Sequence, residues 1–341
     1  MSRLRFVPFV SLAASACFVS MLSAGAQTSS AASQQTPAAT PQQQTAPAAN
    51  TAPQQQEESS SAVTTIRAFV PEVNLVFTVT DNKGHFITGL KQENFGLLDD
   101  GRPPERVTKF TQQTNLPLRV GVLLDTSNSI RQRFKFEQDA AVEFFLQVLH
   151  RGDAAYVEGF DVKTDLVQDY TNNIDKLNTA IHKLRPGGGT AFFDALYTSC
   201  RDQMLTIVSK EPIRKAIIIV SDGHDNQSRV RENDAIKMCQ RAETNVYAIS
   251  TNISPSRDRA DEVLRRIAEA TGGRAFYPTK IEDVAVGFHR IEEELRSQYS
   301  LVYRPADFKQ DGSFRTIYLV ARDPRYHVTT RKGYFAPLPQ R

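Results

Sequence analysis

The chain has 341 residues, of which 40% are hydrophobic and 23% are charged, and this suits globular folding over most of its length, with room for two domains. The formal net charge is +3, and Arg3 and Arg5 in a predicted export signal supply two of these charges. A nearly neutral mature chain excludes electrostatic steering toward polyanions, so no nucleic-acid partner is expected.

The first residues predict export. Residues 1–26 have a basic start and an apolar stretch, and they end in Ala24-Gly25-Ala26, a small-x-small cleavage site. We expect a signal peptide cleaved after Ala26, with no membrane span in the mature chain. An uncleaved anchor is the alternative, and lipidation of Cys17 is a minor one. The protein is therefore expected in the periplasm, on the cell surface or in the medium.

Two segments of different character follow the signal. Residues 27–61 consist largely of Gln, Ala, Thr, Pro and Ser, which predicts a disordered linker because so few apolar side chains can be buried. Residues 62–115 have β character, with apolar and polar side chains alternating from Val73 to Thr80. Asp100-Gly101 predicts a hairpin between two further strands of this segment.

Residues 118–297 show strands that alternate with amphipathic helices, which predicts an α/β fold with a doubly wound, mostly parallel sheet. The expected strands are 118–124, 155–160, 165–170, 215–220, 246–250 and 274–277. One helix carries an apolar stripe formed by Phe134, Ala141, Phe145, Val148 and Leu149, and the last helix carries one formed by Val284, Phe288, Ile291 and Leu295.

After Ser297 the β character returns, over residues 298–337. Two short β segments on either side of an α/β domain most simply pack together, so we expect a flanking β-sandwich built from 62–115 and 298–337. Cleavage of the signal would leave Cys200 and Cys239, and in an oxidising compartment these either form a disulfide or remain buried thiols.

Three polar segments are predicted at one edge of the α/β sheet. Asp125, Ser127 and Ser129 follow the first strand, Thr190 follows three glycines ahead of a helix, and Asp222 follows the strand at 215–220. Ligands of wound sheets bind beyond the carboxyl ends of the strands, where these segments meet. The glycines at 187–189 would let the backbone of Thr190 approach without a Cβ clash.

The side chains of these five residues offer only oxygen donors. This donor set predicts a hard cation, Mg²⁺, Mn²⁺ or Ca²⁺, in preference to zinc. With only two carboxylates against a dication the site is poor in negative charge, so it should favour a carboxylate from outside. Each residue taken singly could also be a helix cap or a turn residue, since Ser, Thr and Asp favour such positions.

The motif Asp125-Thr126-Ser127-Asn128-Ser129, with Thr190 and Asp222 in the same order, resembles the metal-ion-dependent adhesion site of von Willebrand factor type A domains. The resemblance covers about residues 118–297. It implies that the three hydroxyls bind the metal directly and that one or both carboxylates act through water. Asp194 is expected to support a ligand or to cap a turn.

The flanking segments resemble an exported bacterial family, common in acidobacteria, of von Willebrand type A-related proteins. These flanks are "VTDNKGHFITGLKQENFGLLDDGRPPERVTKF" on the amino-terminal side, and "YSLVYRP" with "KGYFAP" on the carboxyl-terminal side. The function of that family is poorly defined, so the resemblance supports the architecture more than an activity.

Three other motifs have ordinary structural interpretations. Arg151-Gly152-Asp153 follows a long helix, where Gly152 caps the helix and Asp153 belongs to the turn. His224 and Asp225 are expected to shape partner recognition rather than to act as an acid–base pair. The triple glycine is not followed by Gly-Lys-Ser/Thr, which argues against nucleotide binding.

The leading functional hypothesis is a non-enzymatic, cation-dependent binding module that captures an Asp or Glu carboxylate of a protein or peptide. An envelope scaffold with a structural metal is the second hypothesis. A metal-dependent phosphohydrolase with Asp125 as nucleophile is a remote third, because Ser127 occupies the position where such enzymes usually have a second acid and no general base is evident.

Overall fold

The computed structural model describes residues 72–113, 116–209, 213–254 and 256–338. The predicted signal peptide, the linker and residues 62–71 lie outside these ranges. Within them, no helix combines the length and the apolar character needed to cross a membrane.

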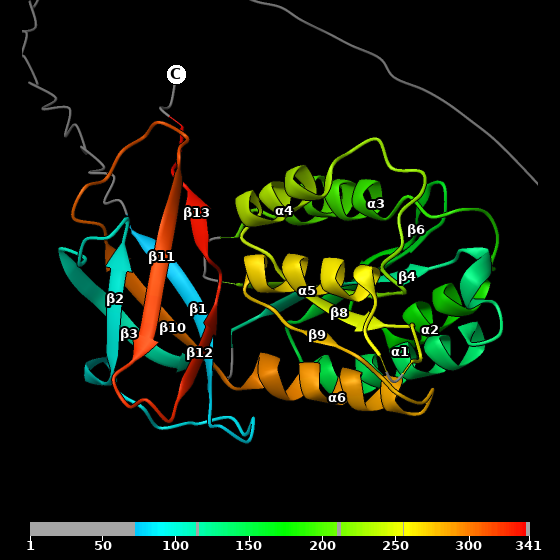
Figure 1. Cartoon of the computed structure of the whole chain (residues 1–341), viewed down its shortest axis with the longest axis horizontal. Helices are drawn as coiled ribbons and strands as arrows, with labels where there is room; N and C mark the ends of the chain where they lie inside the picture. Colours follow the sequence, from blue (N-terminus) through cyan, green and yellow to red (C-terminus); the bar gives the residue numbers. More distant parts are fainter. Residues whose placement is uncertain (1–71, 114–115, 210–212, 255, 339–341) are drawn as a thin grey trace, which may run out of the picture. The chain divides into compact units, whose positions relative to one another are not determined.

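The α/β part contains a six-stranded sheet in the order β6-β5-β4-β7-β8-β9 (Figure 1). All its neighbouring strands are parallel except β6, which runs antiparallel to β5 at one edge. The strands are β4 (Leu118–Asp125), β5 (Ala154–Phe160), β6 (Thr164–Thr171), β7 (Arg214–Ser221), β8 (Asn245–Ser250) and β9 (Ala275–Phe276). The predicted α/β fold with a mostly parallel sheet is confirmed.

Helices cover both faces of this sheet (Figure 1). One face packs against α1 (Phe134–Val148), α2 (Ile174–Lys183) and α6 (Asp283–Arg296). The other packs against α3 (Phe192–Thr198), α4 (Glu232–Arg241) and α5 (Arg259–Thr271), and a π-helical turn, Ser199–Met204, extends α3. Ile218 of β7 belongs to the first core and Ile219 to the second, which explains why this strand is apolar throughout.

Cys200 in the π-helical turn and Cys239 in α4 form a disulfide, with their Cα atoms 5.0 Å apart. Of the two alternatives that the sequence left open, pairing is therefore correct. The bond ties two neighbouring helical segments on the same face of the sheet.

The terminal strands form two further antiparallel sheets, as expected for the flanking β-sandwich. One has the order β12-β1-β10-β3 and the other the order β13-β11-β2. The strands are β1 (Val73–Thr80), β2 (Phe95–Asp99), β3 (Arg106–Gln113), β10 (Gln298–Arg304), β11 (Phe314–Ala321), β12 (His327–Thr330) and β13 (Gly333–Phe335). Because β1 pairs with β10, residues more than two hundred positions apart share one sheet.

The turn at Asp100-Gly101 is present, but the strands on its two sides do not pair with each other, so the predicted hairpin is wrong. Both residues have positive φ, and Asp99 and Arg102 exchange backbone hydrogen bonds of 2.8 and 3.0 Å. However, β2 then pairs with β11 and β3 with β10, in different sheets. Pro103 and Pro104 have no N–H to continue a ladder, and Glu105 donates its amide to Arg304 of β10 instead.

Candidate metal centre

The carboxyl ends of β4 and β7 bring most of the predicted ligands together. Asp125 is the last residue of β4, and Asp222 directly follows β7, the parallel neighbour of β4. Ser129 lies in a 3₁₀ turn, Asn128–Ile130, just beyond β4. Parallel pairing therefore places both carboxylates at one edge of the sheet, as the sequence predicted.

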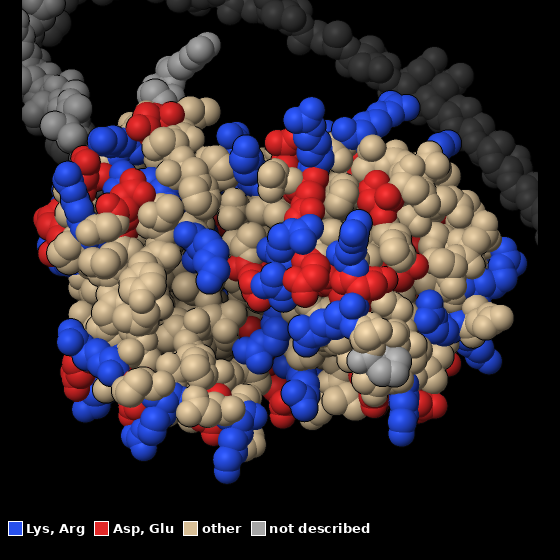
Figure 2. Space-filling model, in the orientation of Figure 1, with Lys and Arg blue, Asp and Glu red and all other residues tan. Residues whose placement is uncertain are grey.

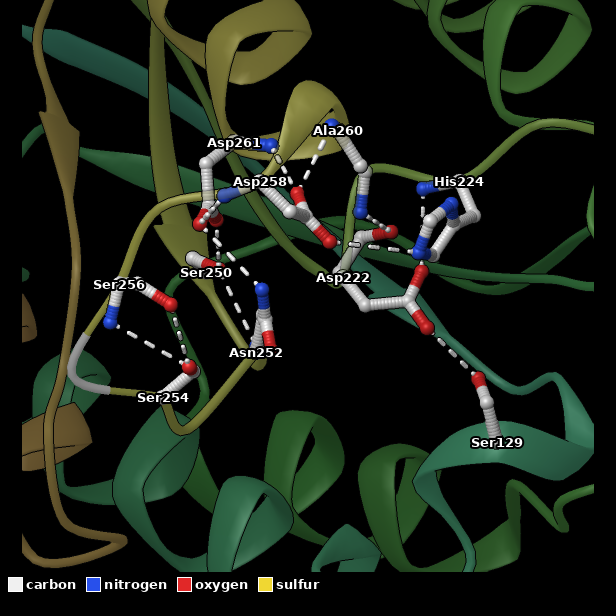
Figure 3. Close-up of polar contacts among 12 residues, drawn as sticks. Ser129, Asp222, His224, Ser250, Asn252, Ser254, Ser256, Asp258, Ala260 and Asp261 are labelled. Carbon is white, nitrogen blue, oxygen red and sulfur yellow. Dashed lines mark hydrogen bonds and ion pairs between the residues drawn. The ribbon is translucent and has the colours of Figure 1, made fainter.

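Hydrogen bonds join four of the five predicted residues. The hydroxyl oxygens of Ser127 and Ser129 are 2.9 Å apart, and Ser129 Oγ donates to Asp222 Oδ2 at 2.9 Å. Asp125 Oδ1 accepts the backbone N–H of Ser127 at 2.8 Å. Figure 3 shows Asp222 reaching toward Ser129 with one oxygen and toward His224 with the other, whose backbone N–H it accepts.

The glycine loop ahead of the predicted ligand Thr190 contacts the turn after β4. Gly187 donates its backbone N–H to Thr126, and Asn128 donates its own to Gly188. Gly188 has φ of 77°, and a Cβ there would lie 2.8 Å from a carboxylate oxygen of Asp161. A Cβ at Gly189 would lie 2.9 Å from Asn226. The predicted need for glycine thus holds at 188 and 189, whereas Gly187 has open space around it.

The sequence prediction missed two supporting side chains. Ser221 Oγ donates to Asp125 Oδ2 at 2.7 Å and so holds the second oxygen of that carboxylate. Asn226 Oδ1 accepts the backbone N–H of Thr190 at 3.0 Å. Ser221 could have been found as the last residue of an otherwise apolar strand. Asn226 acts from a loop whose path the local sequence does not reveal.

The candidate metal centre concentrates negative charge in a buried place. Burial raises the pKa of Asp125, and the charge of Asp222 raises it further, while hydrogen bonds from Ser221 and Ser127 oppose the rise. Glu137 on α1 is also buried, and both its carboxylate oxygens lack a hydrogen-bond partner. Burial raises the pKa of Glu137 to about 8, Arg133 opposes the rise, and Asp125 and Asp222 add to it.

The residues present fit a hard divalent cation. Their side chains supply only carboxylate and hydroxyl oxygens, and the charge of Asp222 acts on the carboxylate of Asp125. Ser129 is exposed, so solvent or an outside group can reach the oxygens. In the described ranges there is no group of three or more His, Cys, Asp or Glu side chains that could hold a metal ion. A cation here would therefore depend on the hydroxyls.

A polar network continues from Asp222 toward α5. His224 is exposed, and its Nε2 lies 3.6 Å from Asp258 Oδ2. Asp258 caps α5 by accepting the N–H groups of Ala260 and Asp261, and Asp261 accepts the hydroxyl of Ser250 at 2.6 Å (Figure 3). The loop that carries Asp222 is thereby linked to the end of β8.

Other residues that the sequence singled out have structural roles. Asp225 accepts the N–H groups of Phe193 and Ser228 and so holds its loop in place, and its expected part in partner recognition stays a prediction. Asp194 accepts two backbone N–H groups, those of Arg229 and Val230, so capping is the role it shows.

Asp153 of the Arg-Gly-Asp motif is buried, as its structural interpretation requires. It accepts the backbone N–H groups of Leu118 and His150 and pairs with Arg296 at 3.1 Å. Its carboxylate therefore joins the start of β4 to the end of α6, and it is not presented to a partner.

Charged side chains of both signs lie side by side over α4 and α5 (Figure 2). Arg265 pairs with Glu262 and Glu269, and Arg266 pairs with Glu232, at distances of 2.7 to 2.8 Å. This face of the molecule carries no large region of a single sign.

Comparison with known proteins supports the fold. Residues 120–288 match the family model of the von Willebrand factor type A domain. Comparison with curated proteins gives no match. Similar solved structures include a mutant of the PilB minor pilin from Streptococcus sanguinis, with a TM-score of 0.43, 15% identity, and coverage of 54% of this chain and 62% of that chain. The present chain thus spans less than two thirds of that pilin.

Two other similar structures come from different bacteria. The von Willebrand factor type A protein from Catenulispora acidiphila has a TM-score of 0.46 and 14% identity, covering 72% of this chain and 74% of that chain. The domain of the type V pili tip protein from Porphyromonas gingivalis has a TM-score of 0.43 and 15% identity, covering 52% of this chain and 94% of that chain. The family match and the wound sheet identify residues 120–288 as a von Willebrand factor type A domain.

Proposed function

We propose that this protein is an exported binding module that uses a divalent cation to capture a carboxylate of a protein or peptide partner. The cation, Mg²⁺ or else Mn²⁺ or Ca²⁺, is held by Asp125, Ser127, Ser129, Thr190 and Asp222. One observation carries the proposal: the hydroxyls of Ser127 and Ser129 lie in a chain of 2.9 Å contacts that ends at Asp222, and Ser129 is exposed.

The charge of the site favours a carboxylate partner. Two carboxylates balance a dication formally, but each shares its charge with hydrogen-bond donors of the chain. An Asp or Glu side chain of a partner adds negative charge, and its carboxylate binds a hard cation more strongly than a hydroxyl does. When bound, the cation supplies positive charge for this contact, and the chain supplies the oxygens that hold it.

The proposal assigns the rest of the chain supporting roles. Residues 1–26 direct export, residues 27–61 act as a linker, and residues 118–297 form the binding domain. The segments 62–115 and 298–337 form the sandwich that supports it. Export would place the protein in the periplasm, on the cell surface or in the medium, and the disulfide suits such an oxidising compartment.

Metal binding is tested by isothermal titration of Mn²⁺ and Mg²⁺ into the purified protein. We expect saturable binding to the unmodified chain, loss of binding in Asp125→Ala, and weaker binding in Ser129→Ala. Ser256→Ala is the matched control, because Ser256 is an exposed serine on a neighbouring loop. Equal binding by all the variants would contradict the assignment.

Partner capture is tested with immobilised peptides that carry a single central Asp or, as the control, Asn. The Asp peptides should retain the protein in Mg²⁺ and release it in chelator, and Asp125→Ala should not be retained. If the protein binds Mg²⁺ but no Asp peptide, the cation has a structural role, as the scaffold hypothesis requires.

A further inference from the structure

Two exposed arginines lie beside the proposed metal site. Arg131 directly follows the 3₁₀ turn that carries Ser129. Arg185 directly precedes Pro186 and the three glycines that lead to Thr190. Both arginines are exposed to solvent. They therefore belong to the two segments that carry the proposed hydroxyl ligands.

Hydrogen bonds hold Arg131 between these two segments. Its Nη2 donates to Asn128 Oδ1 at 3.0 Å and to the backbone oxygen of Pro186 at 3.3 Å. Asn128 in turn donates its side-chain amide to the backbone oxygen of Gly188 at 3.3 Å. The two bonds use both hydrogens of Nη2, and Nε and Nη1 of Arg131 have no hydrogen-bond partner among the described residues.

Arg185 is anchored through one nitrogen and keeps a complete donor edge. Its Nη1 donates to the backbone oxygens of His182 and Leu184, at 2.5 and 2.8 Å. Its Nε and Nη2 have no hydrogen-bond partner within the part of the chain that the structure describes. These two nitrogens form a planar fork that can bind a carboxylate with two parallel hydrogen bonds.

At other exposed arginines of this protein, an acid of the chain fills the same fork. Arg266 donates from Nε and Nη2 to Glu232, at 2.7 and 2.8 Å. Arg201 donates from the same two atoms to Asp202, at 2.6 and 2.7 Å. The fork of Arg185 is therefore unusual in being open, and it is open next to the proposed metal site.

Two acids on neighbouring segments contact other groups. Asp139 on α1 lies 3.3 Å from His182 Nε2, and Asp161, ahead of β6, accepts the backbone N–H of Lys163 at 3.0 Å. In the described ranges, neither acid forms an ion pair with either arginine. The positive charge of the two arginines is thus left for a partner.

We propose that the partner segment is acidic, with one carboxylate bound to the cation and a second carboxylate bound to the fork of Arg185. This inference rests on the proposed function. Arg131, which lies between the two positions, adds positive charge and its own free donors. Side chains two residues apart lie on the same face of an extended segment, so we expect the second acid two residues from the first.

Fluorescence anisotropy with labelled peptides in Mg²⁺ tests this inference. One peptide carries a single central Asp, a second adds a Glu two residues away, and a third adds the Glu at the adjacent position. The Glu two residues away should tighten binding to the unmodified chain by about three- to fivefold, the size expected for an exposed ion pair. The adjacent Glu adds the same charge on the opposite face, so its effect should be smaller.

Substitution of the arginines should remove the gain from the second acid and leave binding of the single-Asp peptide nearly unchanged. Arg185→Gln should abolish the gain, and Arg131→Gln should reduce it. Arg185→Lys keeps the charge without the fork, so it should retain only part of the gain. Arg106→Gln is the matched control, because Arg106 is an exposed arginine of β3 in the sandwich.

Equal affinities for the single-Asp peptide and the peptide with Glu two residues away, or no binding of either, would overturn the inference. A full gain in Arg185→Gln would overturn it as well. The proposed function is judged separately, by the single-Asp peptide alone. Equal binding of that peptide in Mg²⁺ and in chelator contradicts the proposed function, whatever the second acid does.

Discussion

Two buried aspartates, one in each part of the molecule, have opposite surroundings. Asp99 in the sandwich accepts Arg315 Nε at 2.9 Å and the hydroxyls of Tyr303 and Tyr334 at 2.8 and 2.9 Å. Asp125 at the edge of the α/β sheet accepts a serine hydroxyl and a backbone N–H, and the charge that raises its pKa comes from another acid, Asp222.

The difference shows that burial alone does not mark a functional carboxylate. At Asp99 a cation of the protein itself neutralises the charge and two tyrosine hydroxyls donate to the second oxygen, so the charge of the cluster is balanced from within. At Asp125 neutral donors orient the carboxylate but leave the paired negative charges uncompensated. The two like charges repel each other, and a bound cation would reduce this repulsion.

The largest expected effect comes from breaking the sandwich cluster. Asp99→Ala leaves Arg315, which is 4% exposed, without its partner, and it removes the acceptor of two tyrosine hydroxyls. Removing one member of a buried ion pair costs about 3–5 kcal/mol of folding free energy. Denaturant unfolding in chelator measures this loss.

Asp222→Asn is the corresponding change in the proposed metal site. The asparagine keeps an acceptor oxygen and removes one of two like charges, so its cost in chelator should stay within about 1 kcal/mol. If Asp99→Ala and Asp222→Asn destabilise the protein equally, the contrast between the two regions is wrong.

The second effect is stabilisation by the cation. A ligand that binds only the folded state at one hundred times its Kd adds about 2.7 kcal/mol to the free energy of unfolding. Mg²⁺ should therefore stabilise the unmodified chain and also Asp99→Asn, which leaves the proposed metal site unchanged. Asp125→Ala should gain nothing. Unfolding curves with Mg²⁺ and with chelator test this, and a gain by Asp125→Ala equal to that of the unmodified chain would refute it.

Much of the fold was readable because its signals are local and repeated. The apolar strands after residue 118, the helices between them and the polar residues at two strand ends each predict the same wound sheet. The two β segments at either end were also assigned correctly to a flanking sandwich, with Val73–Thr80 as its first strand. The hairpin at Asp100-Gly101 failed because strand partners far along the chain compete with the local turn.

The supporting residues were harder to find for the same physical reason. Ser221 and Asn226 act through contacts made by the fold, to Asp125 and Thr190, rather than through spacing in a motif. Glu137 left a readable signal, since it lies on the apolar stripe of α1, three residues after Phe134 and four before Ala141. An acid in that place breaks the pattern, and the two acids whose charges it meets, Asp125 and Asp222, lie at the ends of β4 and β7.

The smallest effect, over the interval from pH 6 to pH 7.5, is the pH dependence that Glu137 imposes. Burial raises its pKa from 4.5 to about 8, so the folded state binds this proton more tightly than the unfolded state does. The resulting stability is fully present below the unfolded pKa and is lost as the pH rises through about 8. Within that window the free energy of unfolding should fall by about 1.4 kcal/mol per pH unit.

Glu137→Gln removes this proton and leaves the shape of the side chain nearly unchanged. Measured in chelator at pH 6 and pH 7.5, the unmodified chain should lose more stability than Glu137→Gln, because the other titrating groups are common to both. Lys135 on the same helix is exposed, so Lys135→Gln serves as a control for a change of charge alone. Parallel pH profiles for the unmodified chain and Glu137→Gln would contradict this prediction. They would mean that Glu137 is solvated or paired in the folded state, so that burial does not raise its pKa.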